Sequence, residues 1–343
     1  MKLSKRSFIN GSKRLMTAAL FAAFASAGMT LAATSEAKTL RVTLQLPLKN
    51  HLGQNLSAFK EEVEKETGGS LKIEIYPSAQ LYKDSEVPQA VASGSIEMGV
   101  ASITRFAGTI PAVDIFYVPF LFDTASKVEA ATAPGSTVRG PIDEAVLKTG
   151  ARILWWQAYG GAIMLSKGAP IRTPADMKGK KVRVFGKTLG KFVEVLGGAP
   201  TLMSGSKQFL AYQRGTVDAG MTGLSTIPSR KLNQVMDSVT LTNNADVEFV
   251  VLINEKVWQG LTDKEREVVG KAARRAEAEL RSKIAKIEAD SLAYAKANKM
   301  TIVELTDAER KMWRNASKPV VDDFIKRTGK MGEYLVKAAG DLK

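Results

Sequence analysis

The chain contains no cysteine and a single histidine, His51, among its 343 residues. The lack of cysteine excludes disulfide frameworks, Cys-ligated zinc, iron–sulfur clusters and thiol nucleophiles. With only one imidazole a His-rich metal site is also excluded, and any catalytic triad would have to use His51. Most catalytic and metal-binding chemistries are therefore closed to this chain.

Acidic residues are fewer than basic ones, since 35 Asp and Glu stand against 49 Lys and Arg and the formal net charge is +14. Such an excess can mark nucleic-acid binding. Here the basic residues are dispersed among acids and gather only in short clusters, such as the one at Lys178–Arg183. This distribution favours a solvated surface, or a field that attracts anionic ligands, over a nucleic-acid interface. The length and the 45% hydrophobic content are typical of a globular protein of about two domains.

Long apolar runs are confined to the N-terminus. Residues 1–14 carry five Lys or Arg and no acid, Leu15–Ala33 is apolar and rich in small residues, and a polar segment follows. This is the order of a secretory signal peptide. We predict cleavage near residue 33 or 37, by the Sec or the twin-arginine route, so that residues 1–37 are removed. A permanent anchor is the alternative, because a run of this length is just able to span a bilayer. The mature protein is expected to be soluble, in the periplasm.

The rest of the chain alternates between strand and helix patterns. The first unit has period-2 segments at 39–44, 71–76 and 96–101, with helical patterns at 52–67 and 84–93 between them. A second unit has strand patterns at 181–184, 219–223 and 249–253. Thr262 and Glu265 form a capping box that opens a helix predicted to run to about Asn298. The pattern predicts an α/β protein, whose two units are joined by single passes near 160 and 246 and enclose a cleft that can close.

Several blocks of sequence follow one another in an informative order. They are IRTPADMKGKKVRV at 171–184, LGGAPTLM at 196–203 and RGTVDAGMTG at 214–223, with YPSAQLYKDSEV at 76–87, ASGSIEMGV at 92–100 and VPFLF at 118–122 upstream, and LTNNADVEFVVLINEKVWQGLTDKEREVV at 241–269 downstream. In order and spacing they resemble the solute receptors of tripartite ATP-independent periplasmic (TRAP) transporters, dicarboxylate receptors among them. The resemblance covers nearly all of residues 38 to about 310.

This resemblance implies an α/β, two-lobed periplasmic solute-binding protein fold with a central cleft, crossover strands and a long helix across both lobes. Lobe I would comprise 38–160 plus about 247–285, and lobe II 161–246 plus about 286–343 with the C-terminal helices. It also implies that the protein captures a small organic acid and delivers it to small and large membrane permease subunits for uptake driven by an ion gradient. No cofactor, metal or nucleic acid is implied.

The resemblance also implies which residues hold the ligand. In the family, an Arg on a strand of the second lobe grips the ligand carboxylate, and the matching residue here is Arg183. Guanidinium and carboxylate form a two-pronged pair of fixed geometry, so Lys would be a poor substitute. Further candidates from the cleft segments complete the predicted site: Thr222, Arg105, Ser102, Gln45, Trp156, Tyr159 and Glu248.

The ligand class is read from a departure from the family. Receptors of sugar acids commonly carry a second Arg shortly before the Arg183 strand, whereas Tyr159–Met164 has no charge here. We therefore expect a monocarboxylate with an apolar or modestly hydroxylated body, with Arg105 as a potential second cation. The alternatives are a receptor for an ATP-driven importer and a periplasmic enzyme acting on a carboxylate. An enzyme is disfavoured, because no nucleophile is paired with a base.

Overall fold

The computed structural model describes residues 37–342, so the predicted signal peptide lies outside the described residues except for Ala37. The strands are β1 (Lys38–Leu44), β2 (Leu71–Tyr76), β3 (Met98–Ser102), β4 (Ala151–Ser166), β5 (Lys181–Val184), β6 (Ala199–Leu202), β7 (Ala219–Gly223), β8 (Ser238–Thr240), β9 (Asp246–Asn254) and β10 (Thr301–Val303).

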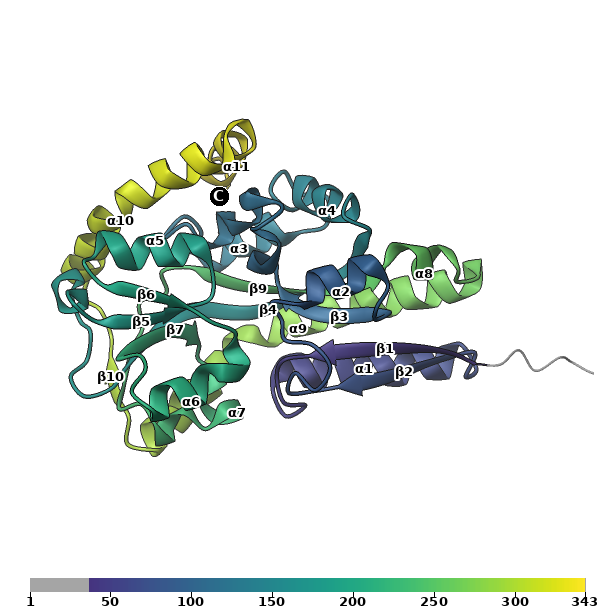
Figure 1. Cartoon of the computed structure of the whole chain (residues 1–343), viewed down its shortest axis with the longest axis horizontal. Coiled ribbons are helices and arrows are strands. Elements are labelled where there is room, and N and C mark those ends of the chain that lie inside the picture. Colours follow the sequence, from purple (N-terminus) through teal and green to yellow (C-terminus); the bar gives the residue numbers. More distant parts are fainter. Residues whose placement is uncertain (1–36, 343) are drawn as a thin grey trace, which may run out of the picture. The chain divides into compact units, whose positions relative to one another are not determined.

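Helices cover the faces of this strand framework (Figure 1). The α-helices are α1 (His51–Glu66), α2 (Val87–Ser93), α3 (Ala125–Thr132), α4 (Arg139–Leu147), α5 (Lys187–Val195), α6 (Gln208–Gln213), α7 (Thr226–Arg230), α8 (Glu255–Gln259), α9 (Asp263–Ala297), α10 (Asp307–Thr328) and α11 (Lys330–Gly340). Short 3₁₀ turns are η1 (Ile103–Phe106), η2 (Pro111–Tyr117), η3 (Pro174–Met177), η4 (Gly205–Lys207) and η5 (Leu232–Gln234). Within residues 37–342, no helix is both long and apolar enough to cross a membrane.

The strands pair in the order β2-β1-β3-β9-β4-β7-β5-β6, with β8 and β10 attached beside β4. The long strand β4 changes partners along its length. Its residues 151–161 pair with β9, and its residues 162–166 pair with β7. Two sheets therefore share one continuous strand. We call the part built on β1, β2, β3 and β9 lobe I, and the part built on β5, β6, β7, β8 and β10 lobe II.

The buried core extends from one lobe into the other through β4. Trp155 and Trp156 are consecutive, so they lie on opposite faces of the strand, and both are fully buried. Trp155 packs against Phe59 of α1, with ring centroids 4.4 Å apart, and Trp156 packs against Phe116 of η2. Each indole nitrogen also donates a hydrogen bond, to Asn55 and to Asp143 respectively. Both tryptophans therefore anchor helices to the sheet.

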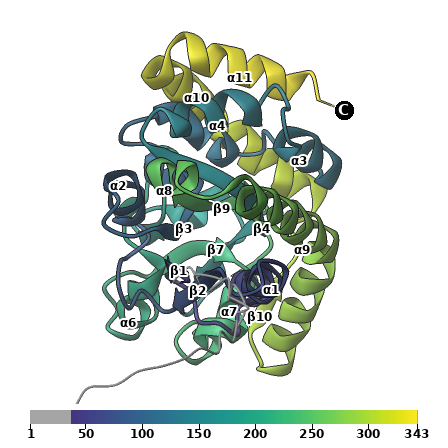
Figure 2. The same cartoon turned by 90° about the vertical axis from the view of Figure 1, so that its right-hand side faces the viewer.

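Helix α9 runs alongside the strands of both lobes (Figure 2). Three of its side chains reach the crossover strands: Glu277 accepts from the Trp156 amide at 3.2 Å, Arg281 donates to Glu248 at 2.9 and 3.2 Å, and Glu288 accepts from the Gly161 amide at 2.8 Å. Their spacing of four and seven residues places them on one face of the helix. The helix is thus fixed by polar contacts where β4 passes between the lobes.

The elements predicted from periodicity largely match the observed ones. The strand patterns at 71–76, 181–184 and 219–223 and the capping box at Thr262 are confirmed. The helix expected at 84–93 begins only at Val87, and Asp84 lies outside it as a fully buried side chain. Strand β4 spans 16 residues, because the uncharged stretch after Arg152 continues from the first sheet into the second.

Gly160 provides a test of the crossover geometry. Its φ is +96°, and a Cβ there would collide with the Glu288 carboxylate, whereas Gly168 has a φ of +75° and open space around it. Positive φ alone costs a non-Gly residue about 1–3 kcal/mol. We expect Gly160→Ala to lower the free energy of unfolding by clearly more than Gly168→Ala in urea titrations. Equal losses would contradict the packing of α9 on this glycine.

Candidate functional site

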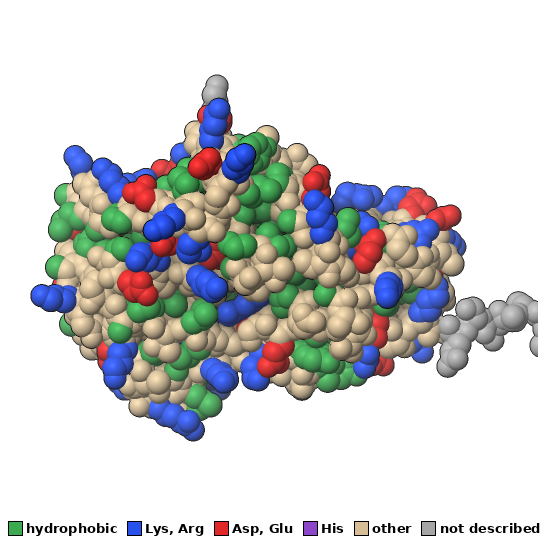
Figure 3. Space-filling model, turned by 45° about the horizontal axis from the view of Figure 1, so that its top comes forward, with side chains coloured by type: hydrophobic (Ala, Val, Ile, Leu, Met, Phe, Trp, Pro, Cys, Tyr) green, Lys and Arg blue, Asp and Glu red, His purple; other side chains and the backbone are tan. Residues whose placement is uncertain are grey.

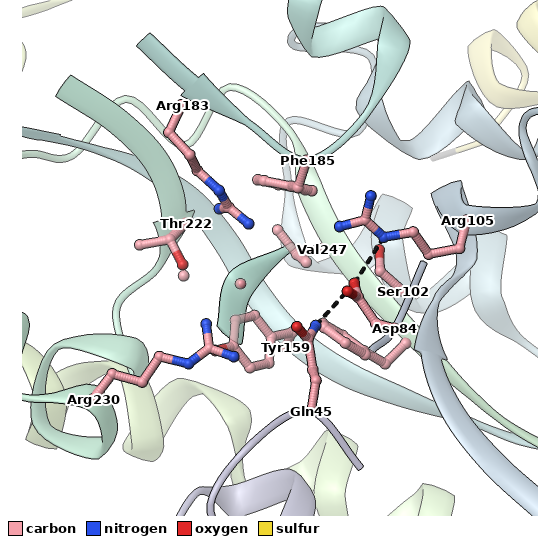
Figure 4. Close-up of a pocket in the computed structure, with 13 residues that line it drawn as sticks. Gln45, Asp84, Ser102, Arg105, Tyr159, Arg183, Phe185, Thr222, Arg230 and Val247 are labelled. Carbon is pink, nitrogen blue, oxygen red and sulfur yellow. Dashed lines mark hydrogen bonds and ion pairs between the residues drawn. The ribbon is translucent and has the colours of Figure 1, made fainter. Parts of the chain in front are cut away.

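A narrow pocket lies where the two lobes meet. Its walls come from lobe I, from the crossover strands and from lobe II. The lining residues are Gln45, Asp84, Ser102, Arg105, Tyr159, Arg183, Phe185, Gly205, Thr222, Gly223, Arg230, Val247 and Phe249. Three of them are arginines, and Figure 4 shows their guanidinium groups converging from three sides.

Arg183 lies on β5 with only 3% of its surface exposed. Its Nη1 donates to the Met221 carbonyl at 2.7 Å and its Nη2 to the Met203 carbonyl at 3.1 Å, while its buried Nε has no partner among the described residues. Burial, with the nearby positive charges of Arg105 and Arg230, lowers its pKa to about 10, so the group remains a cation at neutral pH. Within residues 37–342 no carboxylate pairs with it, so its charge is uncompensated.

Arg105 follows β3 and is held by a buried carboxylate. Its Nε donates to Asp84 Oδ2 at 2.7 Å, which leaves the terminal nitrogens on the pocket side (Figure 4). Asp84 is fully buried and accepts two further hydrogen bonds, from Gln45 at 3.0 Å and from the Ser204 hydroxyl of lobe II. Both carboxylate oxygens are therefore occupied. Asp84 orients Arg105 and links the two lobes at the pocket wall.

Arg230, at the end of α7, is the third cation. Its Nη1 donates to Gln208 at 3.4 Å, and its Nη2 is enclosed without a partner among the described residues. The guanidinium passes directly over Gly205, where a Cβ would lie 2.5 Å from Nη1. Burial lowers the pKa of Arg230. Neither this residue nor Asp84 was among the sequence-predicted candidates, although Arg230 follows the end of β7, the same sheet edge that carries Thr222.

The hydroxyl groups predicted for the site line the pocket but are engaged with protein partners. Thr222 contacts Thr226 at 2.9 Å, and the Tyr159 hydroxyl contacts the same Thr226 at 2.6 Å. Ser102 contacts Tyr117 at 2.8 Å. A hydroxyl can donate one hydrogen bond and accept two, so each keeps capacity for a ligand atom.

Two predicted residues lie outside the pocket. Trp156 is in the core of lobe I, where its indole nitrogen donates to Asp143. Glu248 is fully buried and pairs with Arg281 of α9. On β9, Val247 and Phe249 point to the pocket, so Glu248 between them points to the opposite face. We therefore leave Trp156 and Glu248 out of the candidate site.

The single histidine lies behind the pocket. His51 donates from Nε2 to the carbonyl of Ala158 at 3.2 Å and packs on the Tyr159 ring, with centroids 5.1 Å apart. Burial lowers its pKa to about 4, so it is neutral at physiological pH. Within residues 37–342 no group of three or more His, Cys, Asp or Glu side chains is arranged to hold a metal ion.

The balance of charge decides what the pocket can do. Among the residues of 37–342 that line it, three guanidinium groups share the pocket with one carboxylate, Asp84, which leaves an excess of two positive charges. On the face drawn in Figure 3, by contrast, basic and acidic side chains are interspersed. Buried charge is costly unless it is paired, so this arrangement is suited to enclosing an anion.

Comparison with known proteins places these features in a family. Residues 44–328 match the family model described as bacterial extracellular solute-binding protein, family 7. A C4-dicarboxylate-binding periplasmic protein of Rhodobacter capsulatus is 27% identical over 332 residues, which cover 96% of this chain and 98% of the relative.

Solved structures agree with this assignment. A TRAP periplasmic solute-binding protein from Sulfurospirillum deleyianum with bound succinate superposes with a TM-score of 0.84 at 25% identity, covering 89% of this chain and 99% of that one. A sugar-acid-binding protein from Advenella mimigardefordensis in complex with galactonate gives a TM-score of 0.85 at 25% identity, covering 90% and 99%. The chain therefore belongs to bacterial extracellular solute-binding protein family 7, and it is a non-catalytic solute receptor of the TRAP transporter type.

Proposed function

We propose that this receptor captures a small dicarboxylate, of about the length of succinate, in the pocket between its lobes. The observation that carries the proposal is the excess of two positive charges among the pocket residues. A monocarboxylate would neutralise only one of them. A dicarboxylate supplies one carboxylate for each, and buried ions are stable when they are paired and hydrogen-bonded.

This proposal revises the ligand class expected from the sequence. That expectation considered Arg183 and Arg105, and it did not include Arg230. With Arg230 at the pocket, the uncharged stretch Tyr159–Met164 no longer implies a shortage of cations. The relative from Rhodobacter capsulatus is named for binding C4-dicarboxylates, and the structure from Sulfurospirillum deleyianum holds succinate, which supports the revised class.

In the proposed complex Arg183 binds one carboxylate of the ligand. The backbone carbonyls of Met203 and Met221 accept from its Nη atoms, and its buried Nε has no partner within residues 37–342. Arg230 and the terminal nitrogens of Arg105 receive the other carboxylate. Phe185 stacks under the Arg183 guanidinium at 5.2 Å, which fixes the plane of the cation. The other proposed contacts are Thr222, Ser102, Gln45 and Tyr159.

The proposed cellular role follows from the family. We propose that residues 1–37 direct export to the periplasm, where the named relatives are found, and that the loaded receptor delivers its ligand to small and large permease subunits. We also propose that lobe I comprises 38–160 plus about 247–285 and that lobe II comprises 161–246 plus about 286–343. Strand β4 changes its pairing partner between Gly161 and Ala162, which supports the proposed boundary near residue 160.

Removing Arg183 should nearly abolish binding. Breaking a buried ion pair by removing one partner costs about 3–5 kcal/mol, which corresponds to a loss of roughly 10²–10³-fold or more in affinity. We expect Arg183→Ala to show this loss for succinate in isothermal titration calorimetry and Arg183→Lys to recover only part of it. Arg172→Ala, at an exposed ion pair with Glu309, is the control and should bind as wild type does. Unchanged binding by Arg183→Ala would refute the site.

Arg230 should set the preference for a second carboxylate. Succinate and butyrate have the same number of carbons and differ in one carboxylate. We expect the wild type to prefer succinate by at least about tenfold, or about 1.4 kcal/mol, and Arg230→Met to lose most of this preference with a smaller change for butyrate. Tighter binding of butyrate or galactonate than of succinate by the wild type would overturn the dicarboxylate assignment.

Ligand binding should draw the lobes together. Asp84 of lobe I accepts from Ser204 of lobe II at the pocket wall, and Asn50 of lobe I donates to Ser229 of lobe II at 3.2 Å. Such contacts separate if the lobes rotate apart about a few crossover residues. We expect small-angle X-ray scattering to give a smaller radius of gyration for the mature protein with saturating succinate than without it. An unchanged radius at saturation would indicate a preformed site.

A further inference from the structure

A buried carboxylate of lobe I caps a helix of lobe II immediately beside the pocket. Asp114, on η2, has no exposed surface. Its Oδ2 accepts from the backbone amide of Thr188 at 3.1 Å and from the Thr188 hydroxyl at 2.9 Å, and its Oδ1 accepts from the Thr104 hydroxyl. Thr188 lies in the first turn of α5, so the contact joins the two lobes.

Helix α5 has no cap of its own. Its N-cap position is Gly186, which offers no side chain, and helices leave their first amides without intrahelical partners. Asp114 satisfies one of these amides from the other lobe, at the end of the helix where negative charge is favoured. A Cβ at Gly186 would lie 2.6 Å from the Thr104 hydroxyl oxygen, so the absence of a side chain there permits the close approach.

The capped turn carries the ligand-binding strand. Phe185 immediately precedes Gly186, and Arg183 lies two residues before Phe185. The rings of Phe185 and Tyr117 of η2 meet edge to face, with their centroids 5.4 Å apart and their planes at 83°. The same 3₁₀ segment therefore holds this turn at two points, through Asp114 and through Tyr117. On the lobe I side, Thr104 is adjacent to Arg105 in η1, so the capping contact connects the segments that bear two of the three pocket cations.

We propose that Asp114 is a positioning residue for the ligand site: by capping α5 across the lobes, it holds Arg183 of β5 and Phe185 of the following turn in register with Arg105. The inference rests on the proposed function of the pocket, because it assigns Asp114 a role in that binding. Asp114 is not among the pocket-lining residues, so its effect passes through the β5–α5 turn. Arg327 of α10 supports the same arrangement by donating to the Thr188 hydroxyl at 2.9 Å.

The test uses variants that weaken or remove the cap without touching a pocket residue. Thr188→Val removes the hydroxyl contact with Asp114 at nearly constant shape and leaves the amide contact, Thr188→Ser restores the hydroxyl, and Asp114→Ala removes the acceptor of both contacts. Thr262→Val is the matched control. The Thr262 hydroxyl caps α9 by accepting from the Glu265 amide at 3.2 Å, and Thr262 is not a pocket-lining residue. Each variant is titrated with succinate and with galactonate, and its melting temperature is measured without ligand.

We expect Asp114→Ala to weaken binding by about tenfold, the size that the loss of a typical helix cap would give if it were expressed in binding, and Thr188→Val to weaken it by less. Thr188→Ser should bind as the wild type does. Thr262→Val should lower the melting temperature without changing affinity. Wild-type affinity in both Thr188→Val and Asp114→Ala, in a protein whose binding Arg183→Ala abolishes, would overturn this inference and leave the proposed function intact.

A second measurement needs no ligand. Amide hydrogen exchange at 187–190 should be faster in Asp114→Ala than in the wild type, because the cap protects the first turn of α5, and it should be unchanged in Thr262→Val. Equal exchange in Asp114→Ala and the wild type would refute the cap itself. If the wild type binds neither succinate nor galactonate, the ligand class proposed above fails, and exchange still decides whether Asp114 caps the helix.

Discussion

The excess of positive charge that three guanidinium groups bring to one pocket is the constraint on which the rest of this structure depends. Removing cations from water is costly, and Asp84 balances only one of them. The protein offsets part of this cost with oriented dipoles, since two backbone carbonyls hold Arg183 and the Gln208 amide oxygen holds Arg230. A bound anion would supply the negative charge that the pocket side chains lack. Affinity and stability of the closed pocket are therefore linked through the same charges.

The crossover strands separate this cationic space from an acidic one. Alternation along β9 directs Val247 and Phe249 to the pocket and Asp246 and Glu248 to the opposite face, toward Arg281 of α9. Burial and the adjacent Glu248 raise the pKa of Asp246 well above its ordinary value. One pair of strands thus provides apolar walls for the ligand on one face and polar anchors for the long helix on the other.

The polar contacts between the lobes are compatible with the closure that we propose. Asn50 with Ser229, and Asp84 with Ser204, are neutral or singly charged groups that water could satisfy if the lobes part. The apolar contacts behind them, such as Phe120 against Phe192, lie where η2, α5 and α10 pack together. The junction therefore combines a side that can be hydrated with a side that stays dry.

Local patterns in the sequence determined the strands, the capping boxes, the family and the place of Arg183, because each depends on neighbouring residues or on one contiguous motif. The tertiary structure decided which β4 side chains face the pocket and which face the core. β-Bulges between Ile153 and Trp155 and between Ala158 and Gly160 shift the alternation of side chains along the strand, and helix α4 covers Trp156. Arg230 was missed for a related reason. It lies 47 residues from Arg183 in a short helix, and only long-range packing over Gly205 brings the two cations to one pocket.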